Sequence, residues 1–356
     1  MEKLQILRSL AFIKKEEATV LCFAAFVSFG GFDSFTPFEV RPCAGEEATL
    51  ARTLVPKARV EDVELFSHGC QAYLGRFNRL IKPKKSLGQH FLADGRIARR
   101  IVEAVAPTAD DVILEIGPGE GVLTRLIVER CGYLVCVEID PMLAGRLRTS
   151  IDAKNIRIIE GDALKIDWAE MIRTVRVQWA DRGGYAADAP RVRLVANLPY
   201  YISTPLIQLL IQQPISDMTL MLQQEVVDRI IAGPGGREYG YLSVLVQYHC
   251  EARKLFEVAP SAFRPPPKVR SAVMRLVRRT TPAIPIRNEE RFFALVRAAF
   301  AQRRKTIYNN LKAAEPALGV SVLDQSLLEA AKINPRRRAE TLSIAEFAAL
   351  DAALFE

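Results

Sequence analysis

One stretch of alternating apolar runs and glycines constrains the fold more than any other part of the chain. Residues 111–116 form a short apolar run typical of a buried strand, residues 117–121 form a glycine-rich loop, and residues 122–130 have helical apolar spacing. A second apolar run, residues 133–137, ends at Glu138. A strand, a tight loop, a helix and another strand in this order are typical of a parallel sheet. The sequence therefore predicts an α/β domain.

Polar groups follow the predicted strands where a ligand would bind. The glycines at 117, 119 and 121 let the backbone approach a ligand closely, and Glu138 follows Gly117 by 21 residues, a distance that suits ribose hydroxyls. The loop departs from the dinucleotide-binding pattern, since position 122 is Val. A third predicted strand, residues 155–159, precedes Asp162, which can accept a hydrogen bond from an adenine amino group or can simply stabilise a turn.

The chemistry is predicted at Asn197, Leu198, Pro199 and Tyr200, which follow the apolar run 192–196. In open α/β sheets, ligands bind at the carboxyl ends of the strands. Asn197 offers an acceptor, the proline restricts nearby backbone carbonyls, and Tyr200 adds a flat face. These groups suit methylation of the exocyclic amine of adenine, because two acceptors favour a pyramidal nitrogen and an aromatic ring holds an unstacked base. The alternative is an ordinary turn. Ser203 or Thr204 can cap the helix that we expect from Pro205 to Gln213.

The net charge of +8 is concentrated in one part of the chain. Residues 261–312 contain 13 Lys or Arg and two acids, a local charge of +11, so the remainder sums to −3. A dense basic region favours nucleic acid, because neutralising phosphates releases counterions, although a solvated or membrane-facing surface is the alternative. The region begins with the proline segment 262–269, which either holds Phe263 in place or is a rigid linker.

Composition argues against a metal centre and a disulfide framework. The six cysteines include no C-x-x-C pair, and the three histidines are scattered, so we expect no metal and a reducing, cytoplasmic location. The apolar run 18–32 is short for a membrane span and follows two glutamates, so we expect no membrane association, with a signal anchor as the minor alternative. We expect a monomer.

Seven short motifs occur in order along the chain. They are Ser-Leu-Gly-Gln-His-Phe-Leu (86–92), Glu-Ile-Gly-Pro-Gly (115–119), Val-Glu-Ile-Asp (137–140), Gly-Asp-Ala-Leu (161–164), Asn-Leu-Pro-Tyr-Tyr-Ile-Ser-Thr (197–204), Phe-Arg-Pro-Pro-Pro-Lys-Val-Arg-Ser (263–271) and Phe-Ala-Gln-Arg-Arg-Lys-Thr (300–306). Together they resemble the motifs of the ribosomal RNA adenine dimethylases. The resemblance is greatest to the branch that dimethylates two adjacent adenosines near the 3′ end of small-subunit (16S) rRNA, and it runs from about residue 82 to the C-terminus.

The resemblance implies a class I methyltransferase fold, a Rossmann-like sheet of seven strands with the last strand antiparallel, followed by a small C-terminal all-α domain. It implies S-adenosylmethionine as cofactor and the small ribosomal subunit as partner. The implied cofactor-binding residues are His90, Leu92, Gly117, Glu138, Asp162 and Asn197. The implied catalytic residues are Asn197, Pro199, Tyr200 and Phe263, and we assign RNA binding to Lys268, Arg303, Arg304 and Lys305.

These expectations divide the chain into three parts. Residues 1–78 are a poorly ordered extension outside the family match, residues 79–283 are the catalytic domain, and residues 284–356 are a helical RNA-binding domain. Three alternatives remain open: a large-subunit rRNA dimethylase, whose members usually carry Ile where Leu198 stands, a DNA adenine methyltransferase, and a ribosome-assembly factor without catalysis.

Overall fold

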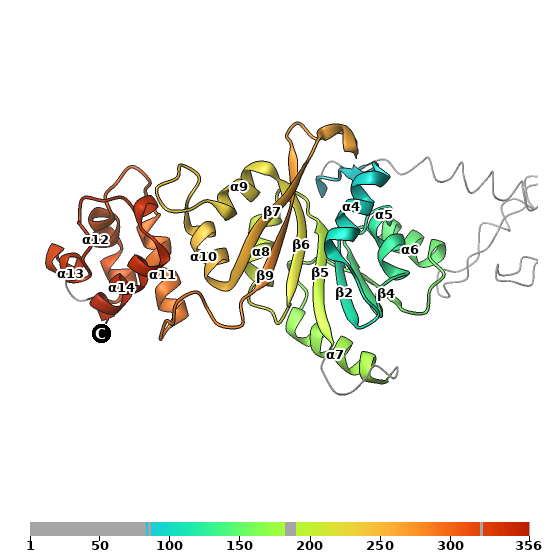
Figure 1. The fold of residues 1–356 in the computed structure, drawn as a ribbon, viewed down its shortest axis with the longest axis horizontal. Coiled ribbons are helices and arrows are strands. Elements are labelled where there is room, and N and C mark those ends of the chain that lie inside the picture. The colour runs from blue at the N-terminus through green and yellow to red at the C-terminus, as the bar shows by residue number, and fades with distance from the viewer. Residues whose placement is uncertain (1–82, 85–86, 182–189, 321–322, 356) are drawn as a thin grey trace, which may run out of the picture. The chain divides into compact units, whose positions relative to one another are not determined.

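The computed structural model describes residues 83–84, 87–181, 190–320 and 323–355 (Figure 1). The predicted N-terminal extension, residues 1–78, lies outside the described residues. In the part of the chain that is described, no helix has the length and apolar character needed to cross a membrane.

A seven-stranded sheet with the order β4-β3-β2-β5-β6-β9-β7 forms the centre of the catalytic region. Its strands are β2 (Asp111–Ile116), β3 (Tyr133–Glu138), β4 (Ile156–Glu160), β5 (Arg191–Asn197), β6 (Asp217–Gln223), β7 (Cys250–Val258) and β9 (Ser271–Arg278). Neighbouring strands from β4 to β6 are parallel, and β9 is antiparallel to both β6 and β7. Every residue of β2 and β3 is buried, as in parallel strands covered on both faces. The predicted α/β fold is confirmed.

Helices cover both faces of this sheet (Figure 1). They are α4 (Gly95–Val105), α5 (Val122–Val128), α6 (Pro141–Ser150), α7 (Trp168–Asp181), α8 (Ser203–Leu210), α9 (Gln224–Ile231) and α10 (Tyr241–His249). Alternate residues of a strand point to opposite faces, so Val112 and Leu114 pack with α7 to α10, whereas Ile113 packs with α4 and α5. The sheet therefore lies between two hydrophobic layers.

The start of α8 differs from our expectation. The sequence places Ser203 or Thr204 as a cap before a helix at Pro205, but the helix begins at Ser203 with Ile202 in the N-cap position. The Ser203 hydroxyl instead donates to the carbonyl oxygen of Tyr200 at 3.0 Å. The hydroxyl stabilises the loop before the helix, so the predicted cap is wrong.

Buried charged side chains join three parallel strands near their amino ends. Arg193 in β5 is 3 % exposed. Its guanidinium donates to Asp217 at 2.8 Å and to Asp111 at 2.9 Å, and these two aspartates begin β6 and β2. Three neighbouring parallel strands are thus cross-linked at their amino ends by charge-assisted hydrogen bonds.

The C-terminal helices share a hydrophobic core with α10. They are α11 (Glu289–Ala299), α12 (Ile307–Leu318), α13 (Gln325–Ala330) and α14 (Ile344–Phe355), with a short 3-10 helix at Ala339–Thr341. Leu242 and Val246 of α10 pack against the sheet, whereas Leu245 and Tyr248 pack with Phe292 of α11 and with residues of the other C-terminal helices. The helix α10 therefore belongs to both cores.

Candidate active site

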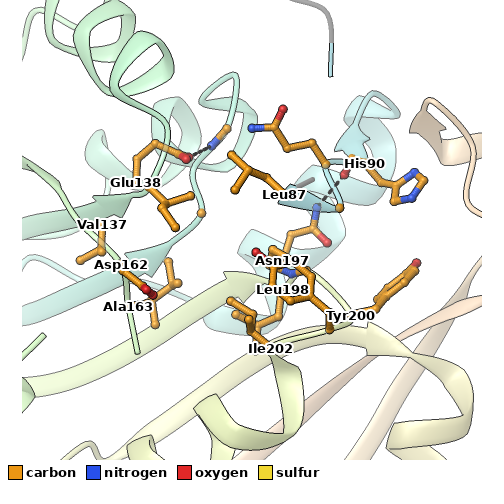
Figure 2. A pocket seen from close by; sticks show the side chains of 18 of the residues that line it. Leu87, His90, Val137, Glu138, Asp162, Ala163, Asn197, Leu198, Tyr200 and Ile202 are labelled. Atoms are coloured by element: carbon orange, nitrogen blue, oxygen red, sulfur yellow. Dashed lines mark hydrogen bonds between the residues drawn. The ribbon is translucent and has the colours of Figure 1, made fainter. Parts of the chain in front are cut away.

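The carboxyl ends of the central strands meet at one pocket. Gly117 follows β2, Glu138 ends β3, Asp162 comes two residues after β4, and Asn197 ends β5. All four line this pocket, in which Figure 2 shows Glu138, Asp162 and Asn197. The parallel strands bring residues that are far apart in sequence to one edge of the sheet, as the motif positions predict.

The segment before α4 forms another wall of the pocket. Residues 87–91 line it, and the segment continues into a short strand, β1 (Phe91–Leu92), paired with β8 (Phe263–Arg264). Lys84 forms an ion pair with Asp140 at 2.9 Å, and the Gln89 amide donates to the same carboxylate at 3.3 Å. Burial opposes ionisation of Asp140, but these bonds outweigh it and hold its pKa below the ordinary value. The segment is thereby attached to the end of β3.

The glycine loop is packed closely between β3 and this segment. Gly119 has a φ of +58°, and a Cβ atom there would lie 3.0 Å from the Phe91 ring. Its amide donates to the Glu138 carboxylate at 3.0 Å, while the Gly117 amide donates to the Val137 carbonyl at 2.9 Å. A side chain at position 119 would therefore open the pocket wall.

Glu138 is suited to accept hydrogen bonds from a diol. Its side chain is 3 % exposed, and burial raises its pKa, partly opposed by the amides of Asp140 and Gly119. Each carboxylate oxygen accepts one of these amides, at 2.9 Å and 3.0 Å, which leaves a lone pair on each oxygen. Two adjacent hydroxyls, as in a ribose, match the remaining acceptor sites.

The Asn197 side chain is oriented by a backbone contact. Its Nδ2 donates to the carbonyl oxygen of His90 at 3.2 Å, which leaves Oδ1 as the free acceptor (Figure 2). The Pro199 carbonyl accepts from the Ile202 amide at 3.2 Å and retains a second lone pair. Two acceptors for one amine are therefore present on the same loop.

The Tyr200 ring is held from β9. Its hydroxyl is hydrogen-bonded to Ser271 Oγ at 2.8 Å, and Ser271 is fully buried. Burial raises the pKa of Tyr200, and the bond to Ser271 partly opposes this. The ring is fixed at its polar end while its face borders the pocket.

The two remaining predicted pocket residues belong mainly to the core. Phe263 lines the pocket but is 3 % exposed, and Leu92 is 5 % exposed and lines a smaller pocket beside the glycine loop. They are paired across the β1–β8 ladder and pack in the same hydrophobic cluster. They hold β1 and β8 together behind the pocket.

The residues assigned to RNA binding lie outside this pocket. Lys268, Arg303, Arg304 and Lys305 are all exposed. The Arg303 guanidinium donates to the carbonyl oxygen of Arg237, in the loop between α9 and α10. The structure thus separates the basic residues after α11 from the pocket.

Sequence reasoning missed several residues that the structure adds to these sites. Ser271 and Asp140 hold pocket residues in position. Each is the last residue of a motif in which we assigned a role only to earlier residues. Arg336 and Arg338 are also exposed. The Ile307 amide donates to the Arg337 carbonyl at 2.7 Å, which brings their loop next to the loop of Arg303, Arg304 and Lys305. We call the exposed basic residues of these two loops, with Lys268, the basic surface. The run of three consecutive arginines in the sequence could have indicated a basic site here, but only the contact between Ile307 and Arg337 shows that these residues lie beside Arg303 to Lys305.

The fold and the pocket define a class I S-adenosylmethionine-dependent methyltransferase. The glycine loop allows a close backbone approach, and Glu138 and Asp162 present carboxylates to the same pocket, which is a set of groups that fits this cofactor. The family model for ribosomal RNA adenine dimethylase matches residues 81–350. The chain belongs to this family, whose methyl donor is S-adenosylmethionine, and the resemblance found in the motifs is confirmed.

Curated relatives and solved structures agree with this assignment. The chain is 44% identical over 276 residues to the ribosomal RNA small subunit methyltransferase A of Geobacillus thermodenitrificans, covering 76% of this chain and 90% of the relative. It is 42% identical over 267 residues to the protein of that name from Xanthomonas axonopodis pv. citri, covering 74% and 93%. A dimethyladenosine transferase from Plasmodium falciparum aligns with a TM-score of 0.58 at 25% identity, covering 73% and 96%. The 23S rRNA methyltransferase ErmE aligns with a TM-score of 0.55 at 26% identity, covering 75% and 100%.

Proposed function

We propose that this enzyme dimethylates the N6 amines of two adjacent adenosines near the 3′ end of small-subunit (16S) rRNA and acts during small-subunit biogenesis. The observation that carries the proposal is the Asn197 amide, whose Nδ2 is bonded to the His90 carbonyl in the pocket that also contains Glu138. Bound S-adenosylmethionine supplies an electrophilic methyl group. The relatives named for the small subunit support the choice of RNA.

The pocket residues divide between cofactor and base. Gly117 and its loop pack along the cofactor backbone, Glu138 accepts the ribose hydroxyls, and Asp162 accepts the adenine amino group. His90 and Asn197 stand between the two halves of the pocket, and Leu92 anchors the segment that carries His90.

Methyl transfer needs orientation and electrostatic stabilisation more than proton chemistry. The amine of adenine is a poor nucleophile because its lone pair is delocalised into the ring. Asn197 Oδ1 and the Pro199 carbonyl accept its two N–H groups and favour a pyramidal nitrogen whose lone pair attacks in line. A C–N bond forms as the C–S bond breaks, and the methylated amine then releases its proton to solvent. The enzyme forms no covalent intermediate.

The basic surface is proposed to bind the RNA backbone. Lys268 lies on the proline segment that borders the pocket, and Arg304 and Lys305 lie on the loop after α11. Phosphate contacts of this kind position the RNA without reading its sequence. Arg303, which is bonded to the Arg237 carbonyl, joins this surface and also holds the loop before α10.

Two alternatives to this function are an enzyme that methylates large-subunit rRNA and an assembly factor that binds RNA without methylating it. A large-subunit enzyme is favoured less, because Leu198 departs from the isoleucine usual there and the identity to ErmE is 26%, against 44% for the small-subunit relative. A purely structural assembly factor has no need for a buried Glu138 and an oriented Asn197.

The deciding experiment offers labelled S-adenosylmethionine with three acceptors in parallel. These are small subunits lacking the modification, naked large-subunit rRNA and duplex DNA. We expect label in the small subunits alone, rising towards two dimethyladenosines per particle. Label in large-subunit RNA identifies a large-subunit rRNA dimethylase, and tight subunit binding without label identifies an assembly factor.

The Asn197→Ala variant tests the site itself. We expect no detectable transfer and a weakened but measurable affinity for S-adenosylmethionine, because only one of the pocket contacts to the cofactor is lost. Asn309→Ala, at an exposed position of α12, is the matched control and retains normal turnover. Near-normal transfer by Asn197→Ala would contradict the assignment.

A further inference from the structure

Asp140 is a buried acid that takes no part in the proposed methyl transfer. It lies two residues after the end of β3, and its side chain is 2 % exposed. Its two carboxylate oxygens have different partners. Oδ1 accepts from the Met142 amide at 3.1 Å and caps α6, whereas Oδ2 accepts from Lys84 Nζ at 2.9 Å and from Gln89 Nε2 at 3.3 Å. One oxygen therefore serves the helix, and the other serves the segment before α4.

The two partners on that segment are also bonded to one another. Gln89 Oε1 accepts from the main-chain amide of Lys84 at 2.8 Å, so the same side chain binds Lys84 through its oxygen and Asp140 through its nitrogen. The Leu87 amide donates to the Lys84 carbonyl at 3.0 Å. Lys84, Leu87 and Gln89 thus form one unit, and Asp140 attaches this unit to the start of α6.

The other end of the segment is held on the Asn197 side of the pocket. There β1 is paired with β8, and the His90 carbonyl accepts from Asn197. His90 Nδ1 lies 2.7 Å from the Pro265 carbonyl oxygen, and because a carbonyl only accepts, Nδ1 carries the hydrogen. Asp140 instead holds the end of the segment near Glu138, whose carboxylate accepts from the Asp140 amide at 2.9 Å.

The segment between these attachments is a wall of the cofactor pocket. Residues 87–91 line the pocket, and Figure 2 shows His90 on one side of it and Glu138 and Asp162 on the other. A cofactor whose ribose is bound by Glu138 lies against this wall. Lys84 is 44% exposed, so water can replace its ion pair with Asp140 and let this end of the wall move.

We propose that Asp140 is a positioning residue, which holds the wall formed by residues 87–91 over the bound cofactor and thereby sets the rate of cofactor release. The inference goes beyond the proposed function, because it rests only on the use of S-adenosylmethionine. Every methyl transfer leaves S-adenosylhomocysteine in the pocket. Its release through an opened wall is therefore needed before each further transfer.

Substitutions can separate the two oxygens of Asp140. In Asp140→Asn the amide oxygen keeps the cap of α6, which turns the amide hydrogens towards Lys84 and Gln89, two groups that only donate there. Lys84→Met removes the ion pair and keeps the main-chain bond to Gln89, whereas Lys84→Arg retains a cation. Asp324→Asn makes the same change at the cap of α13 and is the matched control.

The main measurement is the dissociation rate constant of labelled cofactor, chased with an excess of unlabelled cofactor. In Lys84→Met it rises about 5-fold, the equivalent of about 1 kcal/mol for a half-exposed ion pair. In Asp140→Asn it rises roughly 10- to 100-fold, because a bond from Gln89 to a buried carboxylate is lost as well. Lys84→Arg and Asp324→Asn stay within about 2-fold of wild type. S-adenosylhomocysteine is released faster by the same factors.

Three further readouts distinguish a held wall from a general defect. The variant with both Lys84→Met and Asp140→Asn releases cofactor no faster than Asp140→Asn alone, since the two residues share one interaction. Added salt brings the rates of Lys84→Met and wild type together, because it screens the ion pair. In cofactor-free Asp140→Asn, the amides of residues 87–91 exchange hydrogen faster than in wild type, while those of α5 do not.

Specific outcomes overturn the proposal. If S-adenosylmethionine is released faster but S-adenosylhomocysteine is not, Asp140 acts by its charge on the sulfonium, which only the first of them carries. If the effects of Lys84→Met and Asp140→Asn are additive, the two residues do not act as a pair. Unchanged release in Lys84→Met and Asp140→Asn also refutes it. If Asp140→Asn fails to fold, the comparison of Lys84→Met with Lys84→Arg decides. None of these measurements uses RNA, so they stand apart from a failure of the proposed function.

Discussion

Replacing Glu115 by glutamine tests the charge state of the acid beside the glycine loop. Glu115 is 2 % exposed in β2, one residue before Ile116 and the loop. Burial raises its pKa from 4.5 to about 7, and repulsion from Glu138 adds to this, partly opposed by a bond from the Cys136 thiol. The carboxyl therefore stays largely protonated in the folded protein at pH values where the unfolded chain has released the proton.

The sign and size of the effect follow from proton linkage. Because the folded pKa is raised, the stabilising contribution is complete below pH 4.5 and is lost as the pH rises through about 7. Between these values the folded state binds one more proton, so the free energy of unfolding falls by about 1.4 kcal/mol per pH unit from this group. The full loss is about 3 kcal/mol. Glutamine cannot ionise and removes this dependence.

The assay is urea unfolding of wild type and Glu115→Gln across about pH 4.5 to 8. We expect the difference in unfolding free energy to move by about 3 kcal/mol in favour of the variant as the pH rises. If the glutamine side chain forms poorer hydrogen bonds than the protonated acid, the difference in unfolding free energy shifts by a constant, and its dependence on pH is unchanged. Glu103→Gln, at an exposed position of α4, gives a flat difference as the control. A flat difference for Glu115→Gln would refute the reasoning.

Two other predictions concern the opposite edge of the sheet and the RNA surface. Arg193→Met removes the buried guanidinium that joins Asp111 and Asp217, and leaves these aspartates only their more exposed partners Arg191 and Arg275. We therefore expect urea unfolding to show a loss of about 3 kcal/mol, and a loss below about 1 kcal/mol would mean that the remaining arginines compensate for the buried one. The double variant Arg304→Gln, Lys305→Gln removes two proposed phosphate contacts, so filter binding should show a salt slope smaller by about two, with cofactor affinity unchanged. Arg130→Gln, at an exposed position just after α5, serves as its control, and an equal effect there would argue against a local surface.

Local patterns were sufficient to predict most of the sheet. The strands β2 and β3 are continuous apolar runs, and in a parallel sheet such runs leave little choice of element. The same parallel order places Gly117, Glu138 and Asn197 at one edge, so their meeting in one pocket followed from strand ends alone.

Contacts between distant segments could not be predicted in this way. Tyr200 and Ser271 are 71 residues apart, and His90 and Pro265 are 175 residues apart. No local pattern states which carbonyl accepts from an imidazole or which hydroxyl meets a tyrosine. Even the local cap at Ser203 was mispredicted, because its hydroxyl is used by the loop that carries Tyr200.

The short stretch from His90 to Leu92 links the two halves of the pocket mechanically. Leu92 is anchored in the core, Phe91 packs on Gly119 of the glycine loop, and the His90 carbonyl holds Asn197. A shift of this strand would therefore move the proposed cofactor side and the proposed base side of the pocket together. The second methyl transfer makes the greater demand on this arrangement. A singly methylated amine offers one N–H to two acceptors, so the other contacts of the base have to supply the orientation that the lost hydrogen bond supplied in the first transfer.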